Sequence, residues 1–349
     1  MAVANGTVAG RALFYALLAF SSLHRSRYSQ QAVQLKISAL HNLSASANEE
    51  PLTLAEAAQR VAASMLLGAF DILLPSTSSG EWLWHTQGAM DIVQSTGLKD
   101  QLFESGIGHL LNWVYYHDTL SRFPLRHWQH ESLARQCSEK PCSDSQDVQH
   151  LPLLRHRPAP PSPNPSYAIL NLLSETCGTL LEPWDPRSRS AEYRDRLQAL
   201  EGRVGNVHRK PGVSVSSGPD AELAVDVWQT ATRVYLVRAS QSVWDKPASL
   251  DSLVDWAFAG PIRTCSCPHF FPLFILACEA RTDERRTAIL NLIDRNSLRD
   301  AGRSKTWLRD IIQPIWAHQD LHEDSDLLVN YVGAMNATIS STNSVPSFV

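Results

Sequence analysis

Hydrophobic residues recur at three- and four-residue intervals along almost the whole chain, which is the period of an amphipathic helix. One such stripe consists of Val33, Ile37, Leu40 and Leu43. Thr53 and Glu56 have the spacing of a capping box, and they predict that a long helix begins there and extends to Leu74. Strand patterns are nearly absent. The sequence therefore predicts an all-α fold, a multi-helix array of antiparallel helical hairpins.

The densest apolar run lies in the segment from Cys265 to Arg295, where residues 270–277 are apolar almost without interruption. A helix that is hydrophobic on most faces is normally buried inside a larger helical body. The run is followed by Thr282, Asp283 and Glu284, which are typical of a helix start. We therefore expect a buried helix here, followed by a capped helix with charged residues.

Other helices are predicted over 81–94, ending near Gly97, over 102–122 and over 221–240. Pro124 is expected to end or kink the helix over 102–122, because proline lacks a backbone donor and clashes with the preceding turn.

Two breaks in composition interrupt the helical pattern. Prolines occupy positions 152, 158, 160, 161, 163 and 165, which predicts a Pro-rich linker over 137–166. A Gly/Ser-rich break spans 202–219. We expect a single helical domain over 1–340 with sub-halves of about 1–135 and 167–340, and a disordered tail over 341–349.

The composition is that of a globular chain with a sizeable core: 349 residues, of which 44% are hydrophobic and 19% charged. A formal net charge of −4 argues against nucleic-acid binding over the whole surface. The tightest basic groups, Arg122–Arg126 and Arg285–Arg286, are interpreted as solvated helix faces. No apolar run reaches the length of a membrane span, so no membrane partner is expected. The run 12–20 has the size of a signal-peptide core, but its helical spacing favours an ordinary helix.

Six cysteines, at 137, 142, 177, 265, 267 and 278, show no disulfide framework. Cys265, Cys267, His269 and Cys278 offer four soft ligands in one short segment, as a tetrahedral zinc site requires. Their spacing is not that of a zinc finger or ribbon, and buried thiols behave as small hydrophobes. We therefore expect no metal site here, and free thiols at Cys137 and Cys142.

The adjacent pair His117 and Asp118 resembles an enzyme signature. In helical metal-dependent phosphohydrolases such a dyad binds a metal, and His109 or His85 would be the further ligand. The alternative is a His–Asp pair on a helix surface that makes local hydrogen bonds. Nucleophile elbows, phosphate-binding glycine loops and dinucleotide motifs are missing from the sequence. We expect no catalytic, cofactor-binding or metal-binding residue and no cofactor, and so no enzyme.

Tryptophans at helical positions are expected to be core, although they can also line an apolar pocket between helices. They include Trp82, Trp84, Trp113, Trp228, Trp256 and Trp316.

Four blocks in order, with a weaker fifth, are similar to the helical regulatory domain of fungal transcription factors. The blocks are 14–24, 84–93, 116–123, 271–280 with Arg285–Arg286, and 315–320. This fungal-specific transcription factor domain usually follows a binuclear zinc cluster with six cysteines in one short basic segment. The resemblance covers roughly residues 10–340. In this chain the cysteines are dispersed, so the zinc-cluster module is missing from it.

The resemblance implies a nuclear transcription regulator that acts through a helical regulatory domain and controls a metabolic or secondary-metabolite gene cluster. It implies as partners the transcription machinery or other regulators, a homo- or heterodimer, and a small-molecule effector. DNA contact is expected only indirectly or through an N-terminal module. The alternatives are a phosphohydrolase using His117 and Asp118, and a helical interaction scaffold.

Overall fold

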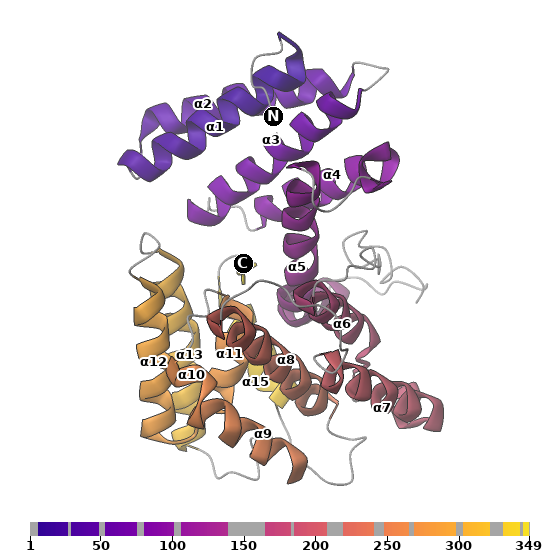
Figure 1. Ribbon diagram of the computed structural model, residues 1–349, viewed down its shortest axis with the longest axis vertical. Coiled ribbons are helices and arrows are strands. Elements are labelled where there is room, and N and C mark those ends of the chain that lie inside the picture. The colour runs from indigo at the N-terminus through magenta and orange to yellow at the C-terminus, as the bar shows by residue number, and fades with distance from the viewer. Residues whose placement is uncertain are drawn as a thin grey trace. The chain divides into compact units, whose positions relative to one another are not determined.

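The computed structural model (Figure 1) describes residues 6–26, 29–48, 53–74, 80–100, 106–138, 165–182, 185–207, 219–240, 248–264, 269–297, 303–321, 331–342 and 345–348. Helices account for most of these residues and no strand occurs among them, so the predicted all-α class is confirmed. None of the described helices is both long and apolar enough to cross a membrane.

The chain divides into two compact units. The N-terminal unit comprises residues 1–121 with 343–347, and the C-terminal unit comprises 122–342 with 348–349. The boundary falls inside helix α5 (Gly106–Ser138). We had placed the boundary between sub-halves at the linker 137–166, most of which lies outside the described residues. The single-domain organisation over 1–340 stays a prediction.

The N-terminal unit is built on α1 (Val8–Ser26), α2 (Gln30–Ala47), α3 (Leu54–Leu73) and α4 (Glu81–Ser95), followed by the 3₁₀ turn η1 (Gly97–Asp100). Helix α1 packs against α2 and α3, and α3 packs against α4. Alanines supply many of the buried positions of α1, α2 and α3. Small side chains let neighbouring helices approach closely.

Helix α3 begins with the predicted capping box. The Thr53 hydroxyl accepts from the Glu56 amide at 3.3 Å, and the Glu56 carboxylate accepts from the Thr53 amide at 3.0 Å. Further along α3, a Cβ added to Gly68 would lie 3.3 Å from the Cβ of His85 on α4. Gly68 therefore allows the close contact between α3 and α4.

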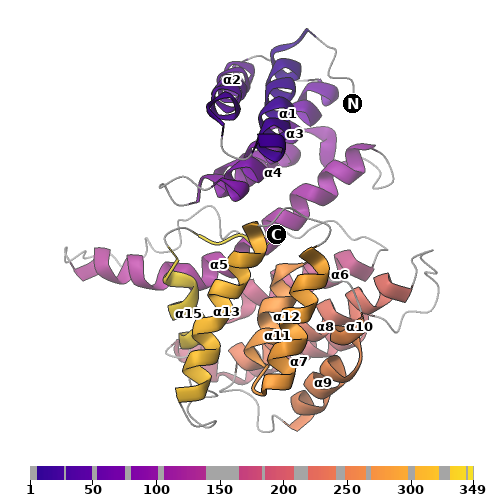
Figure 2. The same cartoon turned by 90° about the vertical axis from the view of Figure 1, so that its left-hand side faces the viewer.

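The C-terminal unit contains α6 (Pro165–Thr179), η4 (Pro186–Arg189), α7 (Ala191–Gly205), α8 (Pro219–Ala239), α9 (Ala248–Ala259), α10 (Pro261–Thr264), α11 (Phe270–Cys278), α12 (Asp283–Ser297), α13 (Arg303–Leu321) and α15 (Tyr331–Ser340). Figure 2 shows α13 between α12 and α15, both of which it contacts. Helix α7 continues to Gly205, so the predicted break at 202–219 begins later than expected, and 208–218 lie outside the described residues.

Helix α11 is the centre of this unit, as the apolar run predicted. All residues from Phe271 to Cys278 are buried, and α11 contacts α8, α12 and α13. Phe123, Tyr235, Phe271 and Phe274 form an edge-to-face cluster, in which Phe123 lies 5.0 Å from Phe271. Such ring pairs stabilise a core beyond the apolar area they bury.

Phe348 belongs to the same cluster. It is fully buried, and its ring lies 5.0 Å from Phe123 and 5.1 Å from Phe274. Its position differs from the disordered tail expected over 341–349. An isolated aromatic residue near a chain end has no periodicity, yet it gains as much from burial as any core residue.

Pro124 does not end the helix, because α5 extends through it to Ser138. Its neighbours Phe123 and Leu125 are buried. Their burial offsets the loss of one backbone hydrogen bond, so the helix continues through Pro124, whereas the kink that we expected as the alternative stays a prediction.

Candidate functional site

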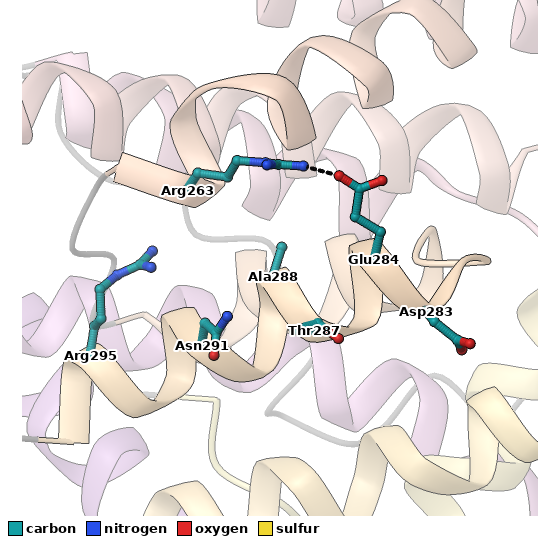
Figure 3. Close-up of a pocket in the computed structure, with 7 residues that line it drawn as sticks. All are labelled: Arg263, Asp283, Glu284, Thr287, Ala288, Asn291 and Arg295. Carbon is teal, nitrogen blue, oxygen red and sulfur yellow. Dashed lines mark hydrogen bonds and ion pairs between the residues drawn. The ribbon is translucent and has the colours of Figure 1, made fainter.

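A surface groove of about 450 Å³ lies between α10 and α12 of the C-terminal unit (Figure 3). Its lining residues are Arg263, Asp283, Glu284, Thr287, Ala288, Asn291 and Arg295. Arg263 comes from α10 and the other six come from α12. The polar groups that line the groove are two guanidinium groups, two carboxylates, one hydroxyl and one amide.

The amphipathic pattern of α12 creates this groove. Ile289, Leu292 and Ile293 are buried. Residues at i, i+3, i+4 and i+7 share one face of a helix, so Glu284, Thr287, Ala288 and Asn291 lie together on another face, toward α10.

The two arginines of the groove differ in their partners. Arg263 is ion-paired with Glu284 and donates through Nε to the Phe258 carbonyl at 3.0 Å. Arg295 donates through Nη2 to the Ile262 carbonyl at 2.7 Å and makes no ion pair within the described residues. One end of the groove therefore carries a guanidinium that forms no ion pair among the described residues, whereas Asp283 and Glu284 line the other end (Figure 3). A guanidinium in this setting can bind a carboxylate or phosphate group.

The segment with Cys265, Cys267, His269 and Cys278 forms no metal site among the described residues. Cys265 and Cys267 lie outside the described residues. Burial lowers the pKa of His269 to about 4, and burial together with Glu279 raises the pKa of the Cys278 thiol well above its usual value. A thiol in such surroundings stays protonated and unreactive. Within the described residues, no group of three His, Cys, Asp or Glu side chains can hold a metal ion.

Two further cysteine predictions concern Cys137 and Cys142. Residue 142 and the side chain of Cys137 lie outside the part of the structure that is described, so their free thiols stay a prediction. Cys177 is buried, and burial raises its pKa to about 11.

His117 and Asp118 are buried rather than on the helix surface, which corrects the surface pair that we expected. Trp113 donates through Nε1 to His117 Nε2 at 2.8 Å, one turn away on the same helix, so that hydrogen bond is local as predicted. Burial lowers the pKa of His117 to about 4. The indole N–H occupies the lone pair of Nε2, so that nitrogen of His117 is not open to a metal ion.

The two other proposed ligands do not join this pair. His85 lies 3.3 Å from Asp71, whose carboxylate also binds Lys36 at 2.6 Å. His109 is exposed on α5. The structure thus brings no phosphohydrolase ligand set together within its described residues.

Comparisons with known proteins identify the family of this chain. The family model described as "Fungal specific transcription factor domain" matches residues 1–341. The chain is also 33% identical over 353 residues to "Transcription factor iacI" of Pestalotiopsis fici, with 100% of this chain and 87% of that protein covered. The chain belongs to the fungal-specific transcription factor domain family. It is accordingly a transcription regulator of fungal type. No solved structure matches it.

The arginines of this regulatory domain are less solvated than their spacing suggested. Arg122 is buried. Arg126 donates to the Leu180 carbonyl at 2.8 Å and pairs with Glu182 at 3.3 Å. Arg286 pairs with Asp320 at 2.7 Å and lies over the Trp316 ring. Arg126 and Arg286 are held by residues of other segments and Arg122 is buried, so the interpretation as solvated helix faces was wrong for these three.

The sequence block over 271–280, which contains α11, includes one charged residue whose burial the sequence pattern did not predict. Glu279 is buried and forms a two-point ion pair with Arg238 of α8, with distances of 3.0 and 2.8 Å. The only sequence signal was a lone acidic residue at the end of an apolar run. Its partner lies 41 positions away and cannot be found from spacing.

Of the six tryptophans that we expected in the core, three are not buried: Trp84 is 70% exposed, Trp256 is 45% exposed and Trp113 is partly exposed. Trp82, Trp228 and Trp316 are buried, as predicted.

Proposed function

We propose that this fungal-specific transcription factor domain works in the nucleus as a regulatory surface, binds other regulators or the transcription machinery, and catalyses no reaction. The family match over residues 1–341 carries the proposal. A transcription factor that is similar over the whole chain supports it. By the same resemblance, its targets belong to a metabolic or secondary-metabolite gene cluster.

DNA contact is assigned to a separate module or partner. The net charge of −4 gives the chain little affinity for phosphates over its whole surface. Several of its arginines are engaged by acidic side chains or carbonyl groups, as at Arg126, Arg238 and Arg286. Side chains that are held in this way are not available to bind phosphates.

The α10–α12 groove is the proposed site for a small effector that carries a carboxylate. Arg295 supplies the charge, Asn291 supplies a hydrogen-bonding group one turn away on α12, and Thr287 supplies another about two turns away. The groove, at about 450 Å³, is within the size range of small-molecule sites.

A reporter assay tests the proposed regulatory role. The chain is fused to a foreign DNA-binding module, and transcription of a gene under that module's site is measured against the module alone. Changed output supports the role, and unchanged output in every growth condition counts against it. Imaging of the chain with a fluorescent tag tests the nuclear location separately.

A thermal-shift measurement tests the groove, with acetate, succinate and citrate as probes. A ligand that binds only the folded state raises the melting temperature. We expect a rise for the wild type that is absent in Arg295→Ala and retained in Arg196→Ala, a matched change at an exposed arginine of α7. Equal rises in all three proteins, or none in the wild type, would contradict the effector site.

A further inference from the structure

The first two helices differ from the rest of the chain in their charge. Residues 1–48 contain four arginine or lysine residues, at positions 11, 25, 27 and 36, and no aspartate or glutamate. The whole chain has a formal net charge of −4, so residues 49–349 carry a net charge of −8. Helices α1 and α2 are therefore a basic element of an otherwise acidic chain, and such an element attracts acidic groups.

Exposed apolar side chains are also concentrated on these two helices. Eight large hydrophobic side chains are exposed among the described residues, and half of them lie on α1 and α2: Phe14, Leu18, Ile37 and Leu40. On α1, Phe14 is 45% exposed and Leu18, one turn later, is 38% exposed. A single exposed apolar residue needs no explanation, whereas neighbouring ones mark a contact surface.

On the outer face of α1, the two apolar residues lie between two arginines. Helical spacing places Arg11, Phe14, Leu18, Ser21 and Arg25 on one face, at i, i+3, i+7, i+10 and i+14. All five side chains are exposed, and we name this face the α1 stripe. The alanines of the opposite face are buried, and α1 packs against α2 and α3.

Neither arginine of the α1 stripe is bound to a carboxylate of the described chain. Arg11 donates through Nε to the Asn42 side-chain oxygen at 3.3 Å and through Nη1 to the Gly6 carbonyl at 3.0 Å. Arg25, in the last turn of α1, makes no ion pair with a described residue. Because no acidic residue occurs in α1 or α2, neither helix neutralises these charges itself. Both guanidinium groups can therefore bind a carboxylate from outside.

We propose that the α1 stripe binds an acidic, amphipathic helical segment of a partner protein. The apolar side of this segment covers Phe14 and Leu18, and carboxylates near its two ends pair with Arg11 and Arg25. The arginines are 14 residues apart on α1, so the carboxylates lie about 21 Å apart, or about four helical turns. The inference rests on the proposed function, because it gives the surface and the chemistry by which the domain binds another regulator.

The α1 stripe fits an acidic protein segment better than a nucleic acid or a lipid surface. Two arginines about 21 Å apart neutralise few phosphates, and apolar side chains lie between them. A helix that inserts into a lipid surface needs a broad apolar face, whereas the broad apolar face of α1 is buried. The acidic remainder of the chain repels an acidic segment, which directs the segment to α1.

Fluorescence anisotropy of the full chain with a labelled peptide tests the proposal. The probe is an alanine- and glutamine-rich helical peptide. It carries two central leucines one turn apart and flanking glutamates at the same spacing as the two arginines. A control peptide has the same composition, with its glutamates moved to the face opposite the leucines. One helix face is smaller than a standard interface, so we expect a Kd on the order of 10–100 µM for the probe.

Substitutions in the α1 stripe are expected to weaken binding of the probe. Arg25→Glu should weaken it about tenfold, because repulsion replaces attraction at an exposed pair. Phe14→Ala and Leu18→Ala should each weaken it about threefold to tenfold, because less apolar area is covered. Arg25 makes no hydrogen bond with a described residue, so Arg25→Glu should leave the helical circular dichroism signal unchanged. Added salt should weaken the binding of the wild type as well.

Two variants serve as matched controls. Arg196→Glu reverses an exposed arginine on α7, and Leu321→Ala truncates an exposed leucine on α13. Both are expected to bind the probe as the wild type does.

Four results would overturn the proposal: no binding of the probe up to about 1 mM, equal binding of the control peptide, binding that Arg25→Glu leaves intact, or tighter binding of duplex DNA or phosphatidylserine vesicles at the α1 stripe. A silent reporter fusion with intact binding of the probe would refute the proposed function alone. An active reporter fusion without binding of the probe would refute this inference alone.

Discussion

Replacing Glu279 with alanine is expected to destabilise the C-terminal unit more than any change to a surface charge. Glu279 binds Arg238 with two hydrogen bonds, of 3.0 and 2.8 Å. The side chains are only 5% and 7% exposed. Removal of the carboxylate would leave the Arg238 guanidinium buried. Among the described residues, the remaining carboxylate in reach is that of Asp251 at 3.8 Å, which is 76% exposed.

The size of the stability loss on Glu279→Ala follows from Coulomb's law and from the desolvation of the remaining charge. Two charges about 4 Å apart attract by about 4 kcal/mol at an effective dielectric constant of about 20. Breaking a buried pair by removing one partner typically costs about 3–5 kcal/mol. Since whole domains are stable by only about 5–15 kcal/mol, this loss would remove a large part of the stability of the unit. By contrast, replacing both partners with apolar residues, as in Arg238→Met with Glu279→Leu, is expected to be nearly neutral or stabilising.

Urea unfolding followed by circular dichroism measures these differences. The single variants Glu279→Ala and Arg238→Met and the double variant Arg238→Met with Glu279→Leu are compared with the wild type. The control is Glu175→Ala, which breaks the exposed pair of Glu175 with Arg203 and is expected to cost about 1 kcal/mol or less. If Glu279→Ala costs no more than this control, the pair is screened by solvent and the reasoning is refuted.

Three further outcomes are expected. Gly68→Ala should lower the free energy of unfolding by about 1–3 kcal/mol, since its Cβ would crowd His85, and Gly88→Ala should raise it by about 0.5–1 kcal/mol; opposite signs in urea titrations would contradict the glycine argument. Burial lowers the pKa of His117 to about 4, below its unfolded value of about 6.5, so the unfolded state binds the proton first. Stability should therefore fall by up to about 3 kcal/mol as the pH drops from about 6.5 to about 4, and His117→Gln should reduce this slope in urea midpoints measured across that range. Phe348→Ala should cost about 3–5 kcal/mol, as for other buried aromatic residues, whereas a melting temperature equal to that of the wild type would mean that the chain end is free.

The histidines and cysteines illustrate how a chemical motif changes its meaning once burial is known. His117 beside Asp118 has the residue types of a metal dyad, but Trp113 occupies its Nε2 at 2.8 Å. Cys278 has the residue type of a zinc ligand, but it is buried within α11. Residue identity alone left both alternatives open. The decisive information was burial and the set of neighbours: Trp113 lies one turn away on the same helix, whereas α11, which carries Cys278, is packed against α8, α12 and α13.

Several features of the fold could be predicted because their causes are local. The capping box at Thr53 and Glu56 needs only residues within one turn, and it is present at the start of α3. The apolar run over 270–277 has no polar face, so its burial followed without knowledge of its partners. Helix ends depend on packing as well: α5 does not end at Pro124, because the burial of Phe123 and Leu125 offsets the lost hydrogen bond.

The sequence by itself therefore determined that the chain is helical, which segment lies at the centre of a core, and to which family it belongs. Only the tertiary structure decided which faces are covered. Helix α2 has its apolar stripe partly exposed at Ile37 and Leu40 and buries Ala32 and Ala39 instead. The physical reason is that hydrogen bonds and side-chain periodicity within a helix depend on neighbours up to four residues away. Burial depends on residues from other helices, such as Arg238 and Glu279, whose positions spacing cannot reveal.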